Sequence, residues 1–296
     1  MHTRDNPANG IKALLSDYLE LTKPGLSLMS VVTALFGYFV TPGSHSLTAV
    51  FAVFVGTALA AGGAAALNQW LEREEDARME RTADRPTPSG RISALGAFAF
   101  GMLLSFASVG LLFALAGFAP ALVAAATIAT YVALYTPLKK LHWISTYVGA
   151  LPGALPPLIG ATALNSSIGL GGWMLFSVLA AWQIPHFMAI AWLYKKDYID
   201  GDFAMLSRYD DTGKTVAMHG LLFSIVLTAI CLFPYFIGRA HWAYAVLSGL
   251  LGIWMIYGSV QFFRHPEDRN VVRRLFFSTL IFLPIYMIVF LLGIQA

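Results

Sequence analysis

The chain is poor in charge and has almost no cysteine. Only 12% of its 296 residues are charged, against 57% that are hydrophobic. Cys231 is the single cysteine and lies inside an apolar run, so we expect it to pack rather than to form a disulfide or bind a metal. The net charge of +3 is too small to indicate nucleic acid as a partner. These features are typical of an integral membrane protein whose surroundings are largely lipid.

Long apolar runs recur with a length suited to crossing a bilayer. A helix needs about 20 apolar residues to span ~30 Å of hydrocarbon. The sequence contains nine such runs, at residues 26–41, 47–69, 95–115, 118–135, 144–163, 170–193, 216–237, 242–263 and 275–293. No linker or change of composition divides the chain. We therefore expect one polytopic domain over residues 1–296, folded as an all-α integral membrane bundle of nine transmembrane helices.

The distribution of charge predicts the orientation of the chain. All of the 19 lysines and arginines except Arg239 lie before the first run or in every second loop, and all 16 acidic residues lie on that same side. Because cytoplasmic loops carry the excess of Lys and Arg, we expect residues 1–25 to form a cytoplasmic segment. The carboxyl terminus then lies on the opposite side of a bacterial plasma membrane. Residues 1–25 have no apolar core before a cleavage site, so the first helix is expected to serve as the insertion signal.

Three oxygen-bearing side chains recur at a four-residue spacing where the second apolar run ends. Asn68, Glu72 and Asp76 lie in LNQWLEREEDARMERTADRP, and on a helix this spacing places them on one face. Oxygen ligands suit Mg²⁺, which is usually held by one or two carboxylates and shared with substrate phosphates. The pattern favours a metal-bridged phosphate ester as substrate. A solvated helix end is the simpler interpretation for the other acids of this loop.

Basic residues close to this triplet indicate phosphate binding. Guanidinium groups match phosphate oxygens in pairs, and three arginines follow the triplet, at Arg78, Arg81 and Arg85. At the end of the fourth run, YTPLKK places Tyr135 and Lys139 four residues apart, with Lys140 adjacent. An ammonium beside a leaving phosphate explains these lysines as well as positive-inside anchoring does.

A second acidic loop follows the sixth run. It reads WLYKKDYIDGDFAML and places Asp197 and Asp200 beside Lys196, with Gly201 four residues after Asp197. Asp197 is the first choice for a second metal ligand and Asp200 the next, while an ordinary charged loop is the alternative. The two acidic loops lie four helices apart, so a bundle that closes on itself could bring them together over a central cavity, as in parallel repeats.

His186 lies in the middle of a membrane run, in WQIPHF. An ionisable side chain at that depth is a functional hypothesis by default. It could be a metal ligand or contact a large planar substrate, or it could simply be hydrogen-bonded between helices; His219 is a weaker case of the same kind. The Gly and Pro residues of GALPGALPPLIG in the fifth run predict a broken helix, which at membrane depth usually lines a cavity.

These stretches resemble the UbiA-type intramembrane prenyltransferase superfamily over roughly residues 21–290. The acidic motif NQWLEREEDARMERTADRP marks the superfamily, whereas WQIPHF and the proline-rich fifth run point to its heme-modifying branch. The resemblance implies nine helices around a central lipid-open cavity, with Mg²⁺ and diphosphate at the cytoplasmic mouth. This sequence departs from the common pattern at two positions: Glu72 stands where an Asp is common, and Gly201 stands where many relatives have a second acid.

The resemblance also implies a reaction and a set of partners. A farnesyl group would move from farnesyl diphosphate to a vinyl carbon of heme B within the membrane lipid, and water would quench the new cation. It implies that the first motif holds metal, that Asp197 belongs to the second, and that Tyr135 and Lys139 lie by the diphosphate. His186 is the candidate for heme contact or axial ligation. A heme A synthase or an oxidase assembly protein would be the expected protein partner.

Three other functions fit parts of the sequence. Prenylation of an aromatic ring, as in quinone biosynthesis, would use the same diphosphate site, and His186 is the residue that distinguishes it. A secondary transporter would also have many helices and Gly/Pro breaks, but it would not need the acidic triplet beside three arginines. A protein that inserts heme without chemistry would give no prenylated product.

Overall fold

The computed structural model describes residues 7–294 of the chain. The first six residues of the expected 1–25 segment and the last two residues of the chain lie outside the described range. Helices make up nearly all of the described part, and no strand occurs in it. They are α1 (Pro7–Leu21), α2 (Pro24–Val40), α3 (Leu47–Leu71), α4 (Arg73–Asp76), α5 (Ala94–Ala116), α6 (Phe118–Ala129), η1 (Thr130–Tyr135), α7 (Thr136–Leu141), α8 (Ser145–Ala154), α9 (Pro156–Leu164), α10 (Leu170–Leu193), α11 (Lys195–Asp200), η2 (Leu206–Tyr209), α12 (Lys214–Phe236), α13 (Trp242–Arg264) and α14 (Arg269–Gly293).

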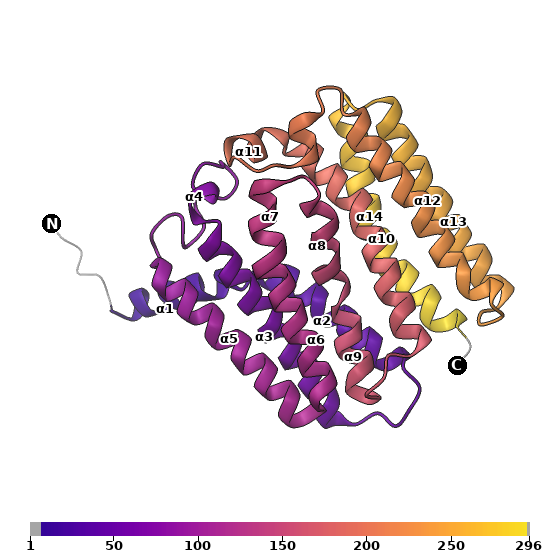
Figure 1. The fold of residues 1–296 in the computed structure, drawn as a ribbon, viewed down its shortest axis with the longest axis horizontal. Coiled ribbons are helices and arrows are strands. Elements are labelled where there is room, and N and C mark those ends of the chain that lie inside the picture. Colours follow the sequence, from indigo (N-terminus) through magenta and orange to yellow (C-terminus); the bar gives the residue numbers. More distant parts are fainter. Residues whose placement is uncertain (1–6, 295–296) are drawn as a thin grey trace.

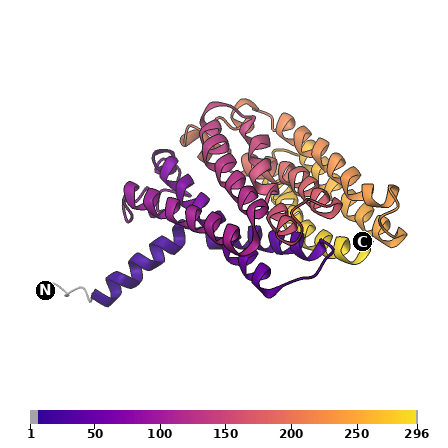
Figure 2. The same ribbon diagram turned by 60° about the horizontal axis from the view of Figure 1, so that its bottom comes forward.

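The predicted membrane runs coincide with these helices. Within residues 7–294, eight helices are long and apolar enough to cross a membrane, and α1 with α2, bent by 49°, raises the number to nine. Two of the spans are interrupted: the fourth passes through η1, and the fifth divides into α8 and α9 before Pro156. The expected all-α bundle is confirmed (Figure 1). Helix α1 was not predicted, and it projects from the bundle (Figure 2).

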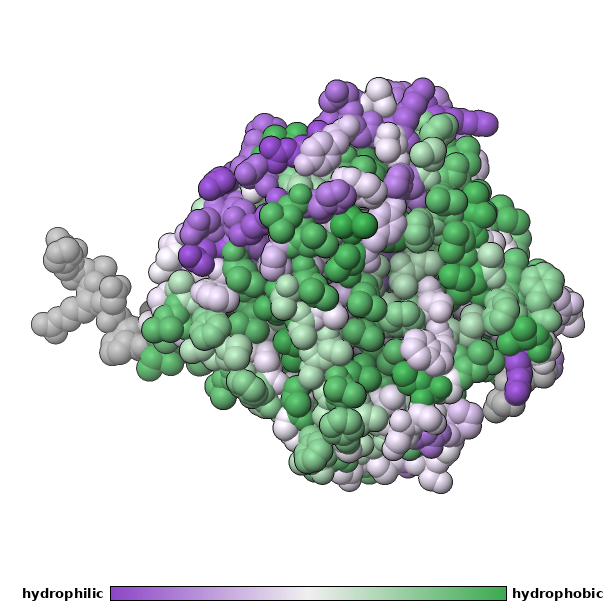
Figure 3. All heavy atoms as spheres, viewed as in Figure 1, coloured by the Kyte–Doolittle hydropathy of each residue, from purple (hydrophilic) through white to green (hydrophobic). Residues whose placement is uncertain are grey.

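Charged side chains gather at one end of the bundle. Figure 3 shows hydrophilic residues along the edge where Figure 1 places α4 and α11, and hydrophobic residues over most of the body on this face. This edge is called the charged end below. It is the end where the sequence predicts the chemistry, because the first and second acidic loops both lie there.

Helices α2 and α9 touch backbone to backbone. A Cβ atom at Gly37 would lie 2.0 Å from the Pro157 carbonyl oxygen, and one at Gly160 would lie 1.8 Å from the Ala34 carbonyl oxygen. Only glycine fits at both positions, because a real Cβ needs over 3 Å. Small residues that allow close backbone approach are a common way to pack helices in lipid, where no hydrophobic driving force holds them together.

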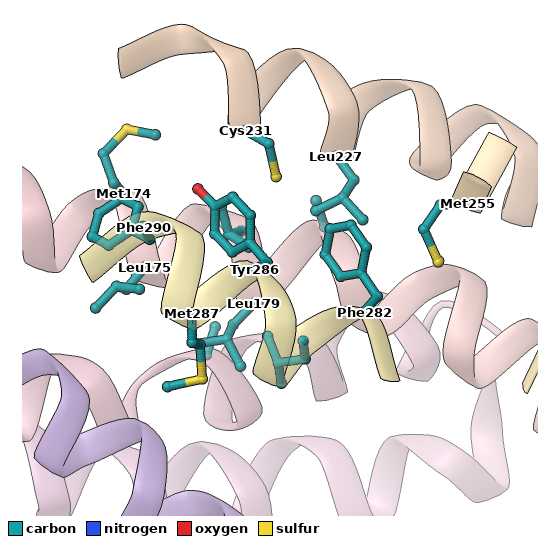
Figure 4. Close-up of a cluster of buried hydrophobic side chains, with 14 of the residues drawn as sticks. Met174, Leu175, Leu179, Leu227, Cys231, Met255, Phe282, Tyr286, Met287 and Phe290 are labelled. Atoms are coloured by element: carbon teal, nitrogen blue, oxygen red, sulfur yellow. The ribbon is translucent and has the colours of Figure 1, made fainter. Parts of the chain in front are cut away.

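A dense apolar core joins α10, α12, α13 and α14. Figure 4 shows Leu227 and Cys231 of α12 beside Phe282 and Tyr286 of α14. The Tyr244 hydroxyl lies 2.9 Å from the Tyr286 hydroxyl and donates to the Cys231 carbonyl oxygen at 2.6 Å. Cys231 is fully buried in this core, which agrees with its expected packing role.

The start of α12 is fixed by the carboxylate of Asp210. Its two oxygens accept hydrogen bonds from the backbone amides of Thr212, Gly213 and Val216 at 2.9–3.1 Å. Burial acts to raise the pKa of Asp210, but the hydrogen bonds from Val216, Thr212 and Gly213 outweigh it and lower the pKa below the ordinary range of an aspartate. The charged form is therefore the one that the folded protein stabilises.

We expect Asp210→Ala to lower the free energy of unfolding by about 1–2 kcal/mol, the usual cost of losing a helix-capping side chain. Because the pKa is lowered by folding, this contribution is complete above the unfolded pKa of ~3.9 and is lost as the pH falls through the folded value. Thermal unfolding of the detergent-solubilised protein should therefore show a difference between wild type and variant that shrinks at acid pH. A difference that stays constant down to that range would contradict the assignment.

Candidate active site

The acidic triplet lies where α3 passes through a kink into α4. Glu72 separates the two helices with a bent backbone, φ −100° and ψ 11°. The hydrogen bonds of the helix nevertheless continue: the Glu72 amide donates to the Asn68 carbonyl at 2.9 Å, and the Asp76 amide donates to the Glu72 carbonyl at 2.7 Å. The three side chains therefore keep their predicted spacing, and each is at most 2% exposed.

Three cations from separate parts of the chain face the triplet. Lys23, at the break between α1 and α2, donates to the amide oxygen of the triplet at 2.9 Å. Arg85, from the loop after α4, lies 2.7 Å from the Asp76 carboxylate, and Lys139 of α7 lies 2.8 Å from the Glu72 carboxylate. Three basic side chains thus face two acidic ones. The excess suits a bound anion.

The triplet also keeps an oxygen atom available for a metal ion. Asp76 Oδ1 is buried and accepts no hydrogen bond from a described residue, although Oδ2 is paired with Arg85. Among residues 7–294, no three Asp, Glu, His or Cys side chains converge as a complete metal site. These residues therefore fit a divalent cation that completes its coordination with the oxygen atoms of a bound diphosphate, as Mg²⁺ commonly does.

The second acidic loop packs against the first. Met79 of the first loop lies in a buried apolar cluster with Phe203 of the second. Arg81 lies 4.0 Å from the Asp197 carboxylate, and its guanidinium stands 5.0 Å from the ring centre of Tyr194. The prediction that the fold brings the two loops together is confirmed. Asp197 is the acid of the second loop that faces the first.

Three predicted site residues lie instead on the exposed rim of the charged end. Asp200 pairs with Lys196 at 3.5 Å, and their side chains are 42% and 88% exposed. Arg78 is also exposed. The four-residue spacing between Lys196 and Asp200 on α11 accounts for their pairing. This arrangement favours Asp197 over Asp200 as a ligand.

The predicted residues of the fourth span have different surroundings. Tyr135 ends the π-helical turn η1, a kind of turn that is frequent at functional sites. Lys139 is buried, and its ammonium stands 4.3 Å from the ring centre of Phe203. Lys140 is paired with Glu75 at 2.6 Å and so fastens α7 to the first acidic loop.

A cavity of about 250 Å³ adjoins this cluster. Lys23 and Tyr135 line it at the charged end, and Thr57 and Ile159 line it elsewhere on α3 and α9. Alanines of α3 and the Gly and Pro residues of the broken α8–α9 helix supply much of the remaining wall: Ala60, Ala61, Ala64, Ala65, Gly149, Pro152, Gly153 and Pro156. The prediction that the broken helix lines a cavity is confirmed. Such a wall suits an extended apolar chain whose polar end meets the cations.

His186 does not line this cavity and lies on the side of α10 that contacts α14. Its ring stacks between Trp182 and Phe276, with ring centres 5.1 and 5.2 Å away. Nδ1 lies 2.8 Å from the Thr279 hydroxyl, which itself donates to the Phe276 carbonyl at 2.6 Å. The Thr279 oxygen therefore accepts from His186, which places the ring proton on Nδ1 and leaves Nε2 as an acceptor.

Two residues of the site were not singled out from the sequence. Lys23 resembles an ordinary positive-inside anchor before the first span, and only the folded structure pairs it with Asn68. Gln183 lies in the stretch WQIPHF, but His186 was the only residue of that stretch predicted to have a functional role. Its amide lines the cavity, whereas the histidine does not. A polar amide within an otherwise apolar span was the available signal.

Comparison with known proteins identifies relatives along almost the whole chain. The model of the UbiA prenyltransferase family matches residues 30–281. The chain is 43% identical over 279 residues to a protein named protoheme IX farnesyltransferase from Opitutus terrae, with 94% of each chain covered. It is 39% identical over 283 residues to a protein of the same name from Solibacter usitatus, with 92% of this chain and 96% of the relative covered.

Solved structures share the fold at low sequence identity. A digeranylgeranylglyceryl phosphate synthase superposes with a TM-score of 0.79 at 16% identity, covering 95% of this chain and 98% of that one. A UbiA homolog from Archaeoglobus fulgidus bound to GPP and Mg²⁺ superposes with a TM-score of 0.66 at 11% identity, covering 93% and 99%.

We expect Lys139→Met to destabilise the protein by about 3 kcal/mol or more, because the Glu72 carboxylate is then buried without its partner. The double variant Glu72→Gln/Lys139→Met should recover most of that loss, since neither charge remains. Thermal unfolding of the wild type, the two single variants and the double variant measures the coupling. Additive losses in the double variant would show that the pair does not act as a unit.

Proposed function

The chain belongs to the UbiA prenyltransferase family, and we propose that it transfers the farnesyl group of farnesyl diphosphate to a vinyl group of protoheme IX (heme B), giving heme O and diphosphate. The observation that carries the substrate assignment is the similarity, over more than nine-tenths of the chain, to proteins named protoheme IX farnesyltransferase. The geometry of the charged end supports the prenyltransferase chemistry itself.

Departure of the diphosphate is the step that the charged end assists. The bond between farnesyl C1 and the diphosphate oxygen breaks only if the charge growing on the leaving group is stabilised. Lys23, Lys139 and Arg85 supply positive charge around that position, in a region from which most water is excluded. Mg²⁺, held by the triplet and by Asp197, would add Lewis-acid stabilisation of the same charge.

The cavity suits the farnesyl chain. Its wall includes Ala, Gly and Pro residues together with the aromatic rings of Tyr131, Tyr135 and Phe187. Aromatic faces carry partial negative charge and attract cations, so these rings would stabilise an allylic cation near them. The aliphatic and aromatic residues of the wall also limit the access of bulk water to that cation, so that the acceptor can react with it first.

His186 is the residue that we assign to the acceptor. The proton on Nδ1 is held by Thr279, so Nε2 is the nitrogen that could bind a heme iron. A histidine that ligates a metal usually donates its other ring N–H in this way, which fixes the tautomer and the ring orientation. Stacking of the ring between Trp182 and Phe276 adds a further restraint.

The chain is an integral membrane protein, and we propose that the charged end faces the cytoplasm of a bacterial cell. The basic residues concentrate there, in agreement with the positive-inside rule. Both apolar substrates would reach the cavity from membrane lipid, while diphosphate would leave at the charged end. A heme A synthase or an oxidase assembly protein is the partner that we propose for the product.

We expect Asp76→Asn to lower formation of heme O by about 100-fold or more, since electrostatic groups at the reacting centre contribute on that scale. Chelation of divalent cations with EDTA should abolish the activity of the wild type, and added Mg²⁺ should restore it. Product formation from protoheme IX and farnesyl diphosphate is followed by mass spectrometry. Glu74→Gln on the same loop is the matched control. Glu74 is 68% exposed and is paired with Arg73, so the activity of this variant should stay within about twofold of the wild type. Full activity of Asp76→Asn, or of the wild type in EDTA, would contradict the proposed function.

We expect His186→Ala to bind farnesyl diphosphate like the wild type but to lose both heme O formation and the shift in the heme absorption spectrum on binding. The physical reason is that no other nitrogen replaces Nε2 beside Trp182 and Phe276. His219→Ala is the control, because His219 is bonded to Tyr147 on a different pair of helices. A fully active His186→Ala variant would remove the heme assignment and favour an aromatic acceptor of the quinone-precursor type.

A further inference from the structure

Gln183 carries the amide group of α10 that lies in the wall of the cavity. The residue is 5% exposed. Its Nε2 donates to the Ala150 carbonyl at 3.1 Å and to the Leu179 carbonyl at 3.0 Å. Both amide hydrogens are thereby used, so the plane of the amide is fixed and the direction of its oxygen is set.

The amide oxygen lies against the broken helix at a position that has no side chain. A Cβ atom at Gly153 would come within 1.9 Å of Oε1, and both residues line the cavity. Among residues 7–294, no donor is hydrogen-bonded to Oε1, whereas both hydrogens on Nε2 are used. Gln183 lines the cavity, so an amide oxygen that lacks a protein donor there suits a ligand that supplies one.

The position of this oxygen relative to the charged end follows from helix geometry. Gly149 faces the ring of Tyr135, and Gly153 follows it by four residues on α8. Lys139 likewise follows Tyr135 by four residues, but this helix runs toward the charged end, whereas α8 runs away from it. At 1.5 Å per residue, Oε1 lies about 12 Å along the helices from the level of Lys139, with the level of Tyr135 about midway.

The proposed reaction includes a step in which a water molecule adds to carbon. The C1–oxygen bond of farnesyl diphosphate breaks with its electron pair on diphosphate, and the vinyl π electrons of protoheme form the new carbon–carbon bond to C1. The vinyl carbon next to the porphyrin ring is then cationic. A water molecule adds through its oxygen lone pair, and its proton leaves to diphosphate or to solvent. If water is absent, the cation loses a proton from the adjacent methylene and becomes an alkene.

We propose that Gln183 Oε1 positions the water that adds to this cation. The inference rests on the proposed function and goes beyond it by assigning the second half of the reaction to a residue. Other polar groups of the wall are less suited. The Thr127 hydroxyl already donates to the Val123 carbonyl at 2.8 Å. The Thr57 hydroxyl has no hydrogen-bond partner among the described residues, but its oxygen exposes almost no surface to a ligand.

The test is the ratio of two products from Gln183→Leu and Gln183→Met, which replace the amide with apolar groups of similar length. Loss of one hydrogen bond to the attacking water should raise the ratio of alkene to hydroxylated product about tenfold. Mass spectrometry distinguishes the two, because the alkene is lighter by one water molecule. In heavy-oxygen water the label should enter the hydroxylated product of the wild type and be absent from the alkene of the variants. Thr127→Val, which removes a polar group of the same wall, should keep the wild-type product ratio.

A lower rate with an unchanged product ratio in both variants would overturn the assignment of Gln183, because a packing defect slows the reaction without redirecting the cation. That result would leave the proposed function intact. Absence of any prenylated protoheme from the wild-type reaction would overturn the proposed function and the role of Gln183 together. Using two variants keeps the test decisive if one of them fails to insert.

Discussion

The buried ion pair between Glu72 and Lys139 is the interaction on which the rest of the structure depends. Taking a carboxylate out of water costs several kcal/mol unless a partner is in place. The partners come from far along the chain: Lys139 lies 67 residues from Glu72, and Lys23 lies 45 residues from Asn68. The acidic end of α3 is therefore tolerated only after α2, α3 and α7 have packed together. The basic and acidic cluster that results is the region to which we assign the diphosphate.

The bundle offers two different environments to the two parts of one substrate. The charged end offers ionic and hydrogen-bonding groups to a diphosphate, while the cavity beside it offers Ala, Gly and Pro surfaces to an isoprenoid chain. Lys23 and Tyr135 line the cavity where it adjoins the charged end, so the bond to be broken would lie at the boundary between them. Low dielectric on one side strengthens each electrostatic contact on the other.

Sequence periodicity and composition were sufficient for the spans and for the first acidic motif. Apolar length alone located the membrane-spanning helices. The four-residue spacing of Asn68, Glu72 and Asp76 survives the kink at Glu72 because the backbone hydrogen bonds continue through it. Pairings between distant segments were not accessible. The sequence does not show that Lys23 is hydrogen-bonded to Asn68 or that Asp200 is exposed. It also does not show that Gln183 lines the cavity and His186 does not. Those outcomes depend on helix rotation, which tertiary packing decides.

The backbone contact between α2 and α9 limits which residues of this bundle can change during evolution. Gly37 and Gly160 admit no side chain, so neither helix can be enlarged or moved there without separating the pair. The residues that line the cavity on α3, Thr57, Ala60, Ala61, Ala64 and Ala65, take no part in this contact. Changes that adapt the cavity to isoprenoids of other lengths are therefore expected among lining residues such as these and not at the two glycines.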